Sequence, residues 1–323
     1  MSLTLLSAND VKQCITMPEA IDAMENAFLQ LANKQVNLPL RTAIAIDRED
    51  ATSLTMPAYL QHENQLGLKV VSFFPNNLRH HLPSINGVIL LLDAQTGEPK
   101  ALMDAVFLTA LRTGAVSGLA TRLLAKEDAS RVAILGSGAQ AMTQIDAVRA
   151  VRPIKQVRIW SRTPEHAEAL AKQLENQIET QVYSTIPYAV KDADIICTST
   201  SSTSPLVYYS DIKENVHINA IGSHTKDMQE IALDVMENAT LIVDQITAAT
   251  KEAGEIIRVL EAGNIEAKSL IELGQLLLHP QPKLKDQRTV FKSVGLAIQD
   301  ISIAEMVYKN AVKRQVGCQF DLS

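Results

Sequence analysis

The sequence of 323 residues predicts an α/β protein of two domains, one with a doubly wound parallel sheet and one smaller α+β domain. Three observations support this fold class. A glycine-rich turn at residues 131–142 joins a short apolar run to a helical pattern. Strand and helix patterns then alternate as far as residue 243, which is typical of a parallel sheet. Before the turn, short stretches at residues 41–92 are rich in β-branched residues, which is typical of a separate sheet.

Composition and charge narrow the classes of function. The hydrophobic fraction of 46% and the charged fraction of 20% are ordinary for a globular protein. A net charge of −6, without any block of lysine or arginine, argues against a nucleic-acid partner. The apolar runs are too short to span a membrane and the N-terminus lacks a basic leader, so we expect a cytoplasmic protein. The widely spaced cysteines, expected to be reduced and to bind no metal, are Cys14, Cys197 and Cys318.

The first domain begins with a capped amphipathic helix and continues as a sheet. Thr16 and Glu19 have the spacing of a capping box, and apolar residues then follow at helical spacing. A hairpin connection is expected at residues 93–99 and a helix at residues 107–124. The expected strands lie at residues 42–46, 53–59, 66–74 and 87–92.

Two cationic residues of this domain have apolar neighbours. Lys69 shares a strand face with Val71 and Phe73, and a buried lysine is costly unless it is paired. Burial also lowers the pKa of a lysine, which makes Lys69 a candidate acid or base; the alternative is an edge-strand lysine that reaches solvent. Arg112 lies among small and apolar residues of its helix, so we expect an anionic partner, either a protein carboxylate or a ligand.

The turn at residues 131–142 has the pattern G-x-G-x-x-A directly after an apolar strand. Gly136 allows a tight turn, Gly138 lets the backbone approach a pyrophosphate, and Ala141 lets the helix lie close to the strand. The N-terminal N–H groups of the helix then face the anion. The motif predicts a dinucleotide site in a Rossmann domain; the alternative is a glycine-rich turn without a ligand.

The remainder of the chain continues the alternation. A helix is expected at residues 165–174, and the chain after residue 255 is expected to be helical and linker-like. A final strand begins at residue 289, and a helix at residues 298–312 is expected to return to the first domain. Further parallel strands are expected at residues 157–160, 180–183, 195–198, 217–221 and 241–243.

The end of the second parallel strand bears on the choice of cofactor. NAD-binding units carry an Asp or Glu there to hold the ribose 2′-hydroxyl, whereas this chain has Ser161, Arg162 and Thr163. Hydroxyls and a guanidinium suit a 2′-phosphate, so the sequence favours NADP (NADPH); NAD (NADH) is the alternative if Arg162 points to solvent. Two loops that follow later strands, residues 197–203 and 219–224, are expected to border the nicotinamide and the substrate.

Short motifs along nearly the whole chain give it a resemblance to a known family. They are Pro39-Leu-Arg41, Met56-Pro-Ala-Tyr59, Gly67-Leu-Lys69, Ala110-Leu-Arg112-Thr-Gly-Ala115, Leu135-Gly-Ser-Gly-Ala-Gln140, Val157-Arg-Ile-Trp-Ser-Arg-Thr163, Asn219-Ala-Ile-Gly-Ser-His224 and Ser293-Val-Gly295. Together they resemble the ornithine cyclodeaminase and mu-crystallin family. The resemblance implies a homodimer, with residues 1–118 and 304–323 forming the substrate-binding and dimerisation domain and residues 119–303 the Rossmann domain.

The resemblance also implies roles for individual residues. The substrate is expected to be a small α-amino or α-imino acid whose carboxylate is held by Arg41 and Arg112. Lys69 is expected to hydrogen-bond or protonate near the reacting carbon and nitrogen. The residues expected to bind the cofactor are Arg112, Thr113, Gly136, Gly138, Ala139, Gln140, Ser161, Arg162, Thr163, Thr198, Ser199, Thr200, Ile221, Gly222 and Ser293.

One departure from the family pattern separates its activities. Cyclodeaminases and alanine dehydrogenases of the family carry an Asp in the segment that matches residues 222–225, where this chain has His224. A histidine can act as a base but supplies no negative charge to hold an ammonium. We therefore expect an NAD(P)H-dependent ketimine reductase that converts Δ1-pyrroline-2-carboxylate or Δ1-piperideine-2-carboxylate to L-proline or L-pipecolate, with His224 assisting Lys69. The alternatives are an ornithine cyclodeaminase, an alanine or N-substituted amino-acid dehydrogenase, and a non-catalytic NADPH-binding protein.

Overall fold

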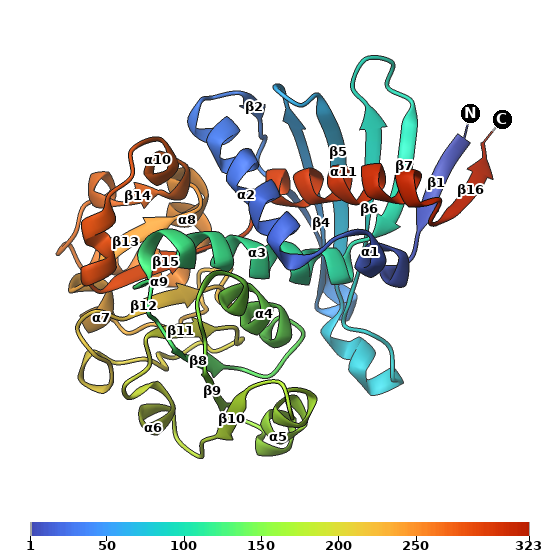
Figure 1. Ribbon diagram of the computed structural model, residues 1–323. Helices are drawn as coiled ribbons and strands as arrows, with labels where there is room; N and C mark the ends of the chain where they lie inside the picture. Colours follow the sequence, from blue (N-terminus) through green and yellow to red (C-terminus); the bar gives the residue numbers. More distant parts are fainter. Residues whose placement is uncertain (1, 323) are drawn as a thin grey trace. The chain divides into compact units, whose positions relative to one another are not determined.

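The computed structural model describes residues 2–322, which fall into two compact units. The first unit runs to Arg112 and resumes at Leu296, and the second runs from Thr113 to Gly295. Each unit combines helices with a sheet, as the sequence predicts (Figure 1). The expected limits at residues 118 and 304 differ from these, because the whole of α11 (Ala297–Arg314) packs against the sheet of the first unit.

The first unit contains an eight-stranded, mostly antiparallel sheet. Its strands are β1 (Ser2–Leu6), β2 (Val36–Asn37), β3 (Thr42–Ile46), β4 (Ala51–Leu60), β5 (Gln65–Phe73), β6 (Ile85–Asp93), β7 (Pro99–Asp104) and β16 (Cys318–Asp321). The order is β16-β1-β7-β6-β5-β4-β2, with β3 also paired to β4. The β1 and β7 pair is parallel. The expected hairpin is confirmed, since β6 leads into β7 through a turn with Gly97 at φ +79°.

Helices cover this sheet. They are α1 (Ala8–Cys14), α2 (Met17–Ala32) and α11, with short 3₁₀ turns η1 (Asp47–Glu49) and η2 (Pro75–His80). The capping box at the start of α2 is confirmed: Thr16 N donates to Glu19 Oε2 at 2.8 Å and Glu19 N donates to Thr16 Oγ1 at 3.4 Å. Helix α11 packs on α2 and lies across β4, β5 and β6 (Figure 1).

The sequence analysis did not predict the strands at the two ends of the chain. Strand β1 pairs with β16 in antiparallel register, with Ser2 opposite Asp321, and with β7 in parallel register. Every residue of β16 is exposed, so its sequence carries no alternation between a buried and an open face. The strand therefore depends on a partner at the opposite end of the chain.

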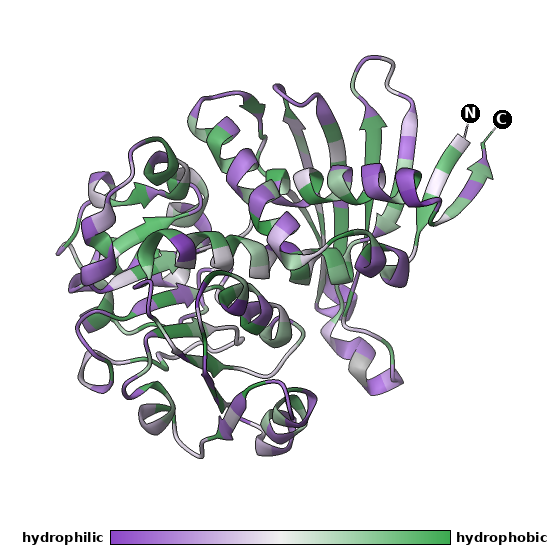
Figure 2. Cartoon of the chain, viewed as in Figure 1, coloured by the Kyte–Doolittle hydropathy of each residue, from purple (hydrophilic) through white to green (hydrophobic). Residues whose placement is uncertain are grey.

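The second unit is built on an eight-stranded sheet of parallel strands. Its strands are β8 (Arg131–Leu135), β9 (Gln156–Trp160), β10 (Glu179–Val182), β11 (Ile195–Thr198), β12 (His217–Ala220), β13 (Thr240–Val243), β14 (Ile271–Glu272) and β15 (Thr289–Lys292). Strands β8, β11, β12 and β15 form its hydrophobic interior (Figure 2). Almost every residue of these four strands is buried, which is typical of a parallel sheet covered on both faces.

Helices join the parallel strands. They are α3 (Val106–Leu124), which begins in the first unit, α4 (Ala141–Val151), α5 (Pro164–Gln173), α6 (Ile186–Val190), α7 (Leu233–Glu237), α8 (Ile246–Glu252), α9 (Gly254–Glu261) and α10 (Leu273–Leu278), with 3₁₀ turns η3 (Tyr209–Asp211), η4 (Ala267–Ser269) and η5 (Pro282–Asp286). The segment after residue 255, expected to be helical and linker-like, is helical in α9 and α10 but also supplies the edge strand β14 to the sheet. Buried Ile256 and Val259 anchor α9 to the core.

The strand order places a topological switch next to β8. From β8 the chain builds β9 and β10 on one side, then crosses to build β11 and β12 on the other. The crevice at the carboxyl ends of the strands beside such a switch is where open α/β sheets bind nucleotides. The glycine-rich turn after β8 lies at this point.

Candidate active site

The buried end of the Lys69 side chain is paired with a carboxylate. Lys69 lies in β5 between Met56 of β4 and Ile89 of β6, and it is 2% exposed. Its Nζ is 2.7 Å from Oδ2 of Asp300. Burial lowers the pKa of Lys69 to about 8, while the charge of Asp300 acts to raise it. Lys69 is therefore a buried, paired lysine of a central strand, not an edge-strand lysine that reaches solvent.

Asp300 also pairs with Arg112. The Arg112 Nε donates to Asp300 Oδ1 at 3.1 Å, and Nη1 donates to Gln299 Oε1 at 2.8 Å. One fully buried carboxylate thus bridges an ammonium and a guanidinium. The expected anionic partner of Arg112 is a protein carboxylate. These two bonds use two of the five N–H donors of a guanidinium, so the group can still bind a further anion.

A close approach between β5 and α11 brings this carboxylate to Lys69. A Cβ atom at Gly67 would lie 2.6 Å from the carbonyl oxygen of Leu90 and 2.9 Å from Cδ1 of Ile301. Only a glycine lets α11 lie this close to the strand. Lys69 follows Gly67 on the same buried face of β5, and Asp300 precedes Ile301 on α11.

Arg41 contributes a third positive charge. It is half-buried and lies directly before β3. Its charge, like that of Arg112, lowers the pKa of Lys69. The first unit therefore brings together the three cationic residues expected to act on the substrate. Asp300 and Gln299, which the sequence analysis did not single out, complete the cluster.

The glycine-rich turn of the second unit has the backbone that a pyrophosphate site needs. Gly136 has φ +106°, and a Cβ there would lie 2.8 Å from the carbonyl oxygen of Ser199, so only glycine fits. Nothing lies within 4 Å of a Cβ placed at Gly138, which leaves space above the backbone. Helix α4 then begins at Ala141 with no side-chain hydrogen bond at its N-cap. Its first N–H groups can therefore bind an anion.

Two buried polar atoms beside this turn have no hydrogen-bond partner among the described residues. They are Oε1 of Gln140 and Oγ of Ser199. A buried polar atom without a partner is costly, so a ligand group that satisfies both would be bound favourably. The turn, the start of the helix and these two atoms together fit a dinucleotide.

The end of β9 is tied to the glycine-rich turn. The Ser137 hydroxyl donates to Oγ of Ser161 at 2.8 Å, and Thr163 N donates to the same oxygen at 3.4 Å. Arg162 between them is exposed. No carboxylate stands at this strand end, and the groups there are compatible with a ribose 2′-phosphate.

The other expected cofactor residues of the second unit lie at three neighbouring strand ends. Thr198 ends β11 and is followed by Ser199 and Thr200, Ile221 and Gly222 follow β12, and Ser293 follows β15. Asp244, which the sequence analysis did not single out, holds the last of these turns. Its Oδ2 accepts from Ser293 Oγ at 2.9 Å, Val294 N at 2.8 Å and Gly295 N at 2.9 Å. Thr113 is buried in α3, beside the contact between Gly114 and Thr143 of α4.

His224 is an exposed residue of the second unit. Its Nδ1 lies 2.9 Å from the carbonyl oxygen of Gly222, so Nδ1 is the donor and Nε2 is left as an acceptor in the neutral ring. The hydrogen bonds and ion pairs described for the cluster of Lys69, Arg112 and Asp300 do not include His224. Its role beside Lys69 stays a prediction.

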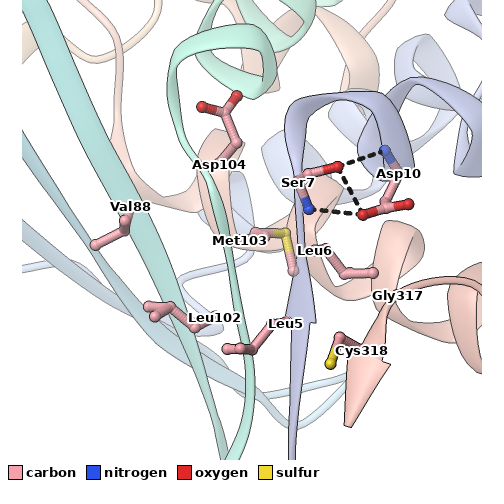
Figure 3. Close-up of a pocket in the computed structure, with 10 residues that line it drawn as sticks. All are labelled: Leu5, Leu6, Ser7, Asp10, Val88, Leu102, Met103, Asp104, Gly317 and Cys318. Carbon is pink, nitrogen blue, oxygen red and sulfur yellow. Dashed lines mark hydrogen bonds between the residues drawn. The ribbon is translucent and has the colours of Figure 1, made fainter. Parts of the chain in front are cut away.

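A separate hollow of about 550 Å³ lies in the first unit, lined by residues of β1, β6, β7 and β16 (Figure 3). Leucines of β1 and β7 line it, together with Ser7 and Asp10. These two polar residues are engaged with each other in a capping box, with Ser7 N 2.8 Å from Asp10 Oδ2. Asp104 and Cys318 also line this hollow, but none of Lys69, Arg112 and Arg41 does.

The described residues contain neither a cluster of metal ligands nor a membrane-spanning helix. His80 ends η2 and His81 follows it, and both residues are exposed. Across residues 2–322, no group of three or more His, Cys, Asp and Glu residues is placed to hold a metal ion. No helix in the same range is both long and apolar enough to cross a bilayer.

Comparison with known proteins gives consistent matches over the whole chain. The sequence model of the ornithine cyclodeaminase/mu-crystallin family matches residues 1–315. A Δ1-pyrroline-2-carboxylate reductase of Bacillus cereus is 37% identical over 321 residues, which cover 98% of each chain.

Two solved structures are similar throughout. The Δ1-pyrroline-2-carboxylate reductase of Thermococcus litoralis, in complex with NADH and L-proline, has a TM-score of 0.94 and 36% identity, covering 98% of this chain and 99% of that one. An archaeal alanine dehydrogenase dimer with bound NAD has a TM-score of 0.93 and 30% identity, covering 100% of both chains.

Proposed function

The chain belongs to the ornithine cyclodeaminase/mu-crystallin family, and from this premise we propose that it is an NAD(P)H-dependent reductase of cyclic α-imino acids. The substrate is Δ1-pyrroline-2-carboxylate or Δ1-piperideine-2-carboxylate, and the product is L-proline or L-pipecolate. The similarity to two Δ1-pyrroline-2-carboxylate reductases supports this substrate class. The observation that carries the proposal is the buried cluster of Lys69, Asp300 and Arg112.

This cluster suits an imine that carries a carboxylate. Two arginines, Arg112 and Arg41, supply positive charge for the carboxylate of the substrate. Their fixed positions would hold the imine carbon in one orientation, which is the main requirement for a transfer between two bound molecules. Gln299 and Asp300 keep the Arg112 guanidinium in place through hydrogen bonds of 2.8 Å and 3.1 Å.

Lys69 is the proposed acid. Its pKa of about 8 lies close enough to neutrality for the ammonium to give up a proton and regain it. Reduction of the C=N bond requires a hydride at carbon and a proton at nitrogen. Lys69 provides or maintains the proton at the imine nitrogen. The partial positive charge that results on the imine carbon makes this carbon the acceptor of the hydride. Asp300 stabilises the protonated lysine between turnovers.

The reduced nicotinamide cofactor, when bound, supplies the hydride. We assign its pyrophosphate to the turn from Gly136 to Gln140 and to the start of α4, where the backbone has the required form. Ser161, Arg162 and Thr163 lie where the adenosine ribose would be bound and favour NADPH through their hydroxyls and guanidinium. NADH remains the alternative, since similar structures hold NADH or NAD.

A second candidate is an amino-acid dehydrogenase. The similar archaeal alanine dehydrogenase favours it, because its chain aligns with this one over the full length of both. The residue at position 224 argues against it, because the family resemblance implies an Asp in cyclodeaminases and alanine dehydrogenases where this chain has His224. A neutral histidine cannot balance the charge of a substrate ammonium.

One assay separates these activities. Purified protein is mixed with NADPH or NADH and with each of Δ1-pyrroline-2-carboxylate, Δ1-piperideine-2-carboxylate, pyruvate plus ammonia, and ornithine, and absorbance at about 340 nm is followed. The proposal predicts steady loss of absorbance with the cyclic imines. A cyclodeaminase releases ammonia from ornithine with no net change in absorbance, and a non-catalytic protein binds NADPH without turnover.

We also propose that the subunit forms a homodimer through the sheet of the first unit. Large apolar side chains of β3, β5 and β6 are exposed there, two on each face of the sheet, and exposed apolar side chains are common in interfaces. They are Ile44, Phe73, Ile85 and Val88. The similar alanine dehydrogenase is a dimer. Sedimentation equilibrium tests this proposal by giving the mass of one chain or of two.

Three free thiols are compatible with the proposed cytoplasmic location.

A further inference from the structure

Glu230 is a fully buried acid of the second unit that belongs to none of the motifs considered above. Its carboxylate lies between the loops that follow β11 and β12. It accepts four hydrogen bonds from these two loops and a fifth from Thr198 at the end of β11. Among the hydrogen bonds described for the structure, no other carboxylate accepts as many from the ends of these two strands.

The two carboxylate oxygens divide the donors between them. Oε1 accepts from Thr200 N at 2.6 Å and from Thr200 Oγ1 at 2.7 Å. Oε2 accepts from Thr198 Oγ1 at 2.8 Å, from Gly222 N at 2.8 Å and from Ser223 N at 3.2 Å. Three of these donors are backbone N–H groups, which cannot reverse their role. The site therefore requires two oxygen acceptors, as in a carboxylate.

The packing around Gly222 shows how closely the loops are held. A Cβ at Gly222 would lie 2.3 Å from the carbonyl oxygen of Thr200 and 2.5 Å from Oε1 of Glu230. The second loop therefore lies directly on the first, with the carboxylate filling the space beside them. A change in either loop must move the other.

A second layer fixes Glu230 itself. Its backbone N donates to Oε1 of buried Glu255 at 2.8 Å, and Ser223 Oγ donates to the other oxygen of Glu255. Lys292 Nζ lies 3.5 Å from Oε2 of Glu255 and offsets part of the negative charge. Burial raises the pKa of Glu230, and the charge of Lys292 and the hydrogen bonds from Thr200 act in the opposite direction.

The strand order indicates which half of the cofactor these loops face. The turn after β8 binds the pyrophosphate in the proposed function, and the end of β9 lies on the adenosine side. Strands β11 and β12 lie on the other side of β8. A dinucleotide that crosses the switch point therefore places its nicotinamide half over the loops that Glu230 joins.

We infer that Glu230 is a positioning residue for the nicotinamide half of the cofactor. It sets the spacing of the loops at residues 198–200 and 221–223, and through them the position of the ring. This inference rests on the proposed use of a nicotinamide cofactor. The hydrogen bonds described for the Glu230 carboxylate go to Thr198, Thr200, Gly222 and Ser223, and none goes to the turn after β8 or to the end of β9, which are assigned to the adenosine half.

The test compares two ligands in the variant Glu230→Gln. An amide has a single oxygen, so its NH₂ group must face donors, and two or three of the five hydrogen bonds are lost. Isothermal titration calorimetry measures the Kd of NADH and of ADP-ribose, which lacks the nicotinamide. We expect the Kd of NADH to rise about tenfold or more, while the Kd of ADP-ribose stays within about twofold of the original value.

Two further variants make the result decisive. Thr198→Val removes one donor to Glu230 with little change of shape, at a fully buried position. It covers the case in which Glu230→Gln does not fold, and the expected rise in the Kd of NADH is about threefold. Glu214→Gln makes the same chemical change at an exposed site of the same unit and is expected to alter neither ligand.

Either of two outcomes overturns the inference. In one, both ligands weaken together, which means that Glu230 only supports the fold of the unit. In the other, the Kd of NADH is unchanged in each variant that folds. If the unaltered protein binds NADH but reduces no imine, the proposed function fails while the comparison of the two ligands still decides the role of Glu230.

Discussion

The ammonium of Lys69 and the carboxylate of Asp300 lie 2.7 Å apart, and both side chains are almost completely buried. The same carboxylate accepts from Arg112 at 3.1 Å. Burial lowers the pKa of Lys69 and the carboxylate opposes that effect, so the lysine titrates near the pH of a cell. This relationship underlies the proposed proton transfer and the first two predictions.

The pH dependence of imine reduction is expected to follow Lys69. The protonated form is the acid, and its pKa is about 8, below the ordinary lysine value of 10.5. Reductive kcat/KM should therefore fall as the pH rises through about 8. Oxidation of the amino acid needs Lys69 in its neutral form as the base, so the oxidative kcat/KM should rise over the same interval. Initial rates from pH 6 to pH 10 in both directions measure this. Parallel changes in the two directions would contradict the assignment.

Asp300→Asn is expected to move the alkaline limb of that profile to lower pH. Removing the carboxylate takes away the influence that raises the pKa of Lys69 and leaves two buried cations without their partner. The variant should also lose about 3–5 kcal/mol of stability. The pH profile and thermal unfolding are the measurements.

Glu305→Gln is the matched control for this change. Glu305 lies on the same helix, but its carboxylate pairs with Lys100 at 2.9 Å, whereas Lys69 pairs with Asp300. Its profile should stay that of the unaltered protein. If Asp300→Asn keeps the original profile, Asp300 does not control the ionisation of Lys69.

Arg41→Met is expected to raise the KM for the imino acid by about 10- to 100-fold, with a smaller effect on kcat. A charge-assisted hydrogen bond to the substrate carboxylate is worth about 1.5–3 kcal/mol. Arg41 is half-buried before β3, so the fold should tolerate the change. Arg48→Met, at an exposed arginine of η1, serves as the control. Equal KM values for the two variants would remove Arg41 from the substrate site.

Gly138→Ala is expected to preserve the fold but to weaken the cofactor. A Cβ at Gly138 meets nothing within 4 Å in the protein, so thermal unfolding should be unchanged. The added methyl group occupies the space through which the pyrophosphate approaches, and we expect the Kd of NADPH to rise about tenfold or more. Gly136→Ala, where φ is +106°, should lower both stability and affinity. Unaltered NADPH binding in Gly138→Ala would place the cofactor elsewhere.

Much of the second unit follows from local sequence. The turn after β8, the end of β9 and the alternation of strands are each encoded within a few residues. Lys69 and Arg112 could also be identified, because a charged residue among apolar neighbours is visible without any structure. Their relation to each other could not, since Asp300 lies 188 residues beyond Arg112.

Long-range pairing also accounts for the other features that were missed. Asp300 and Gln299 interrupt an apolar segment between Ile298 and Ile301, which is a signal of the same kind as Lys69. A single buried acid in a helix does not name its partner, however. Glu230 is similar: its five donors come from loops that are far apart in sequence, and only the folded sheet brings them together.

The central claim is that the cofactor is consumed and that its hydride is delivered to the imine carbon. Reduced NADPH that carries deuterium at the transferring position of C4 tests this directly with Δ1-pyrroline-2-carboxylate. We predict L-proline with one deuterium at C2, detected by mass spectrometry, in a one-to-one ratio with NADPH oxidised. Unlabelled proline, or ammonia released from ornithine without loss of NADPH, would contradict the claim.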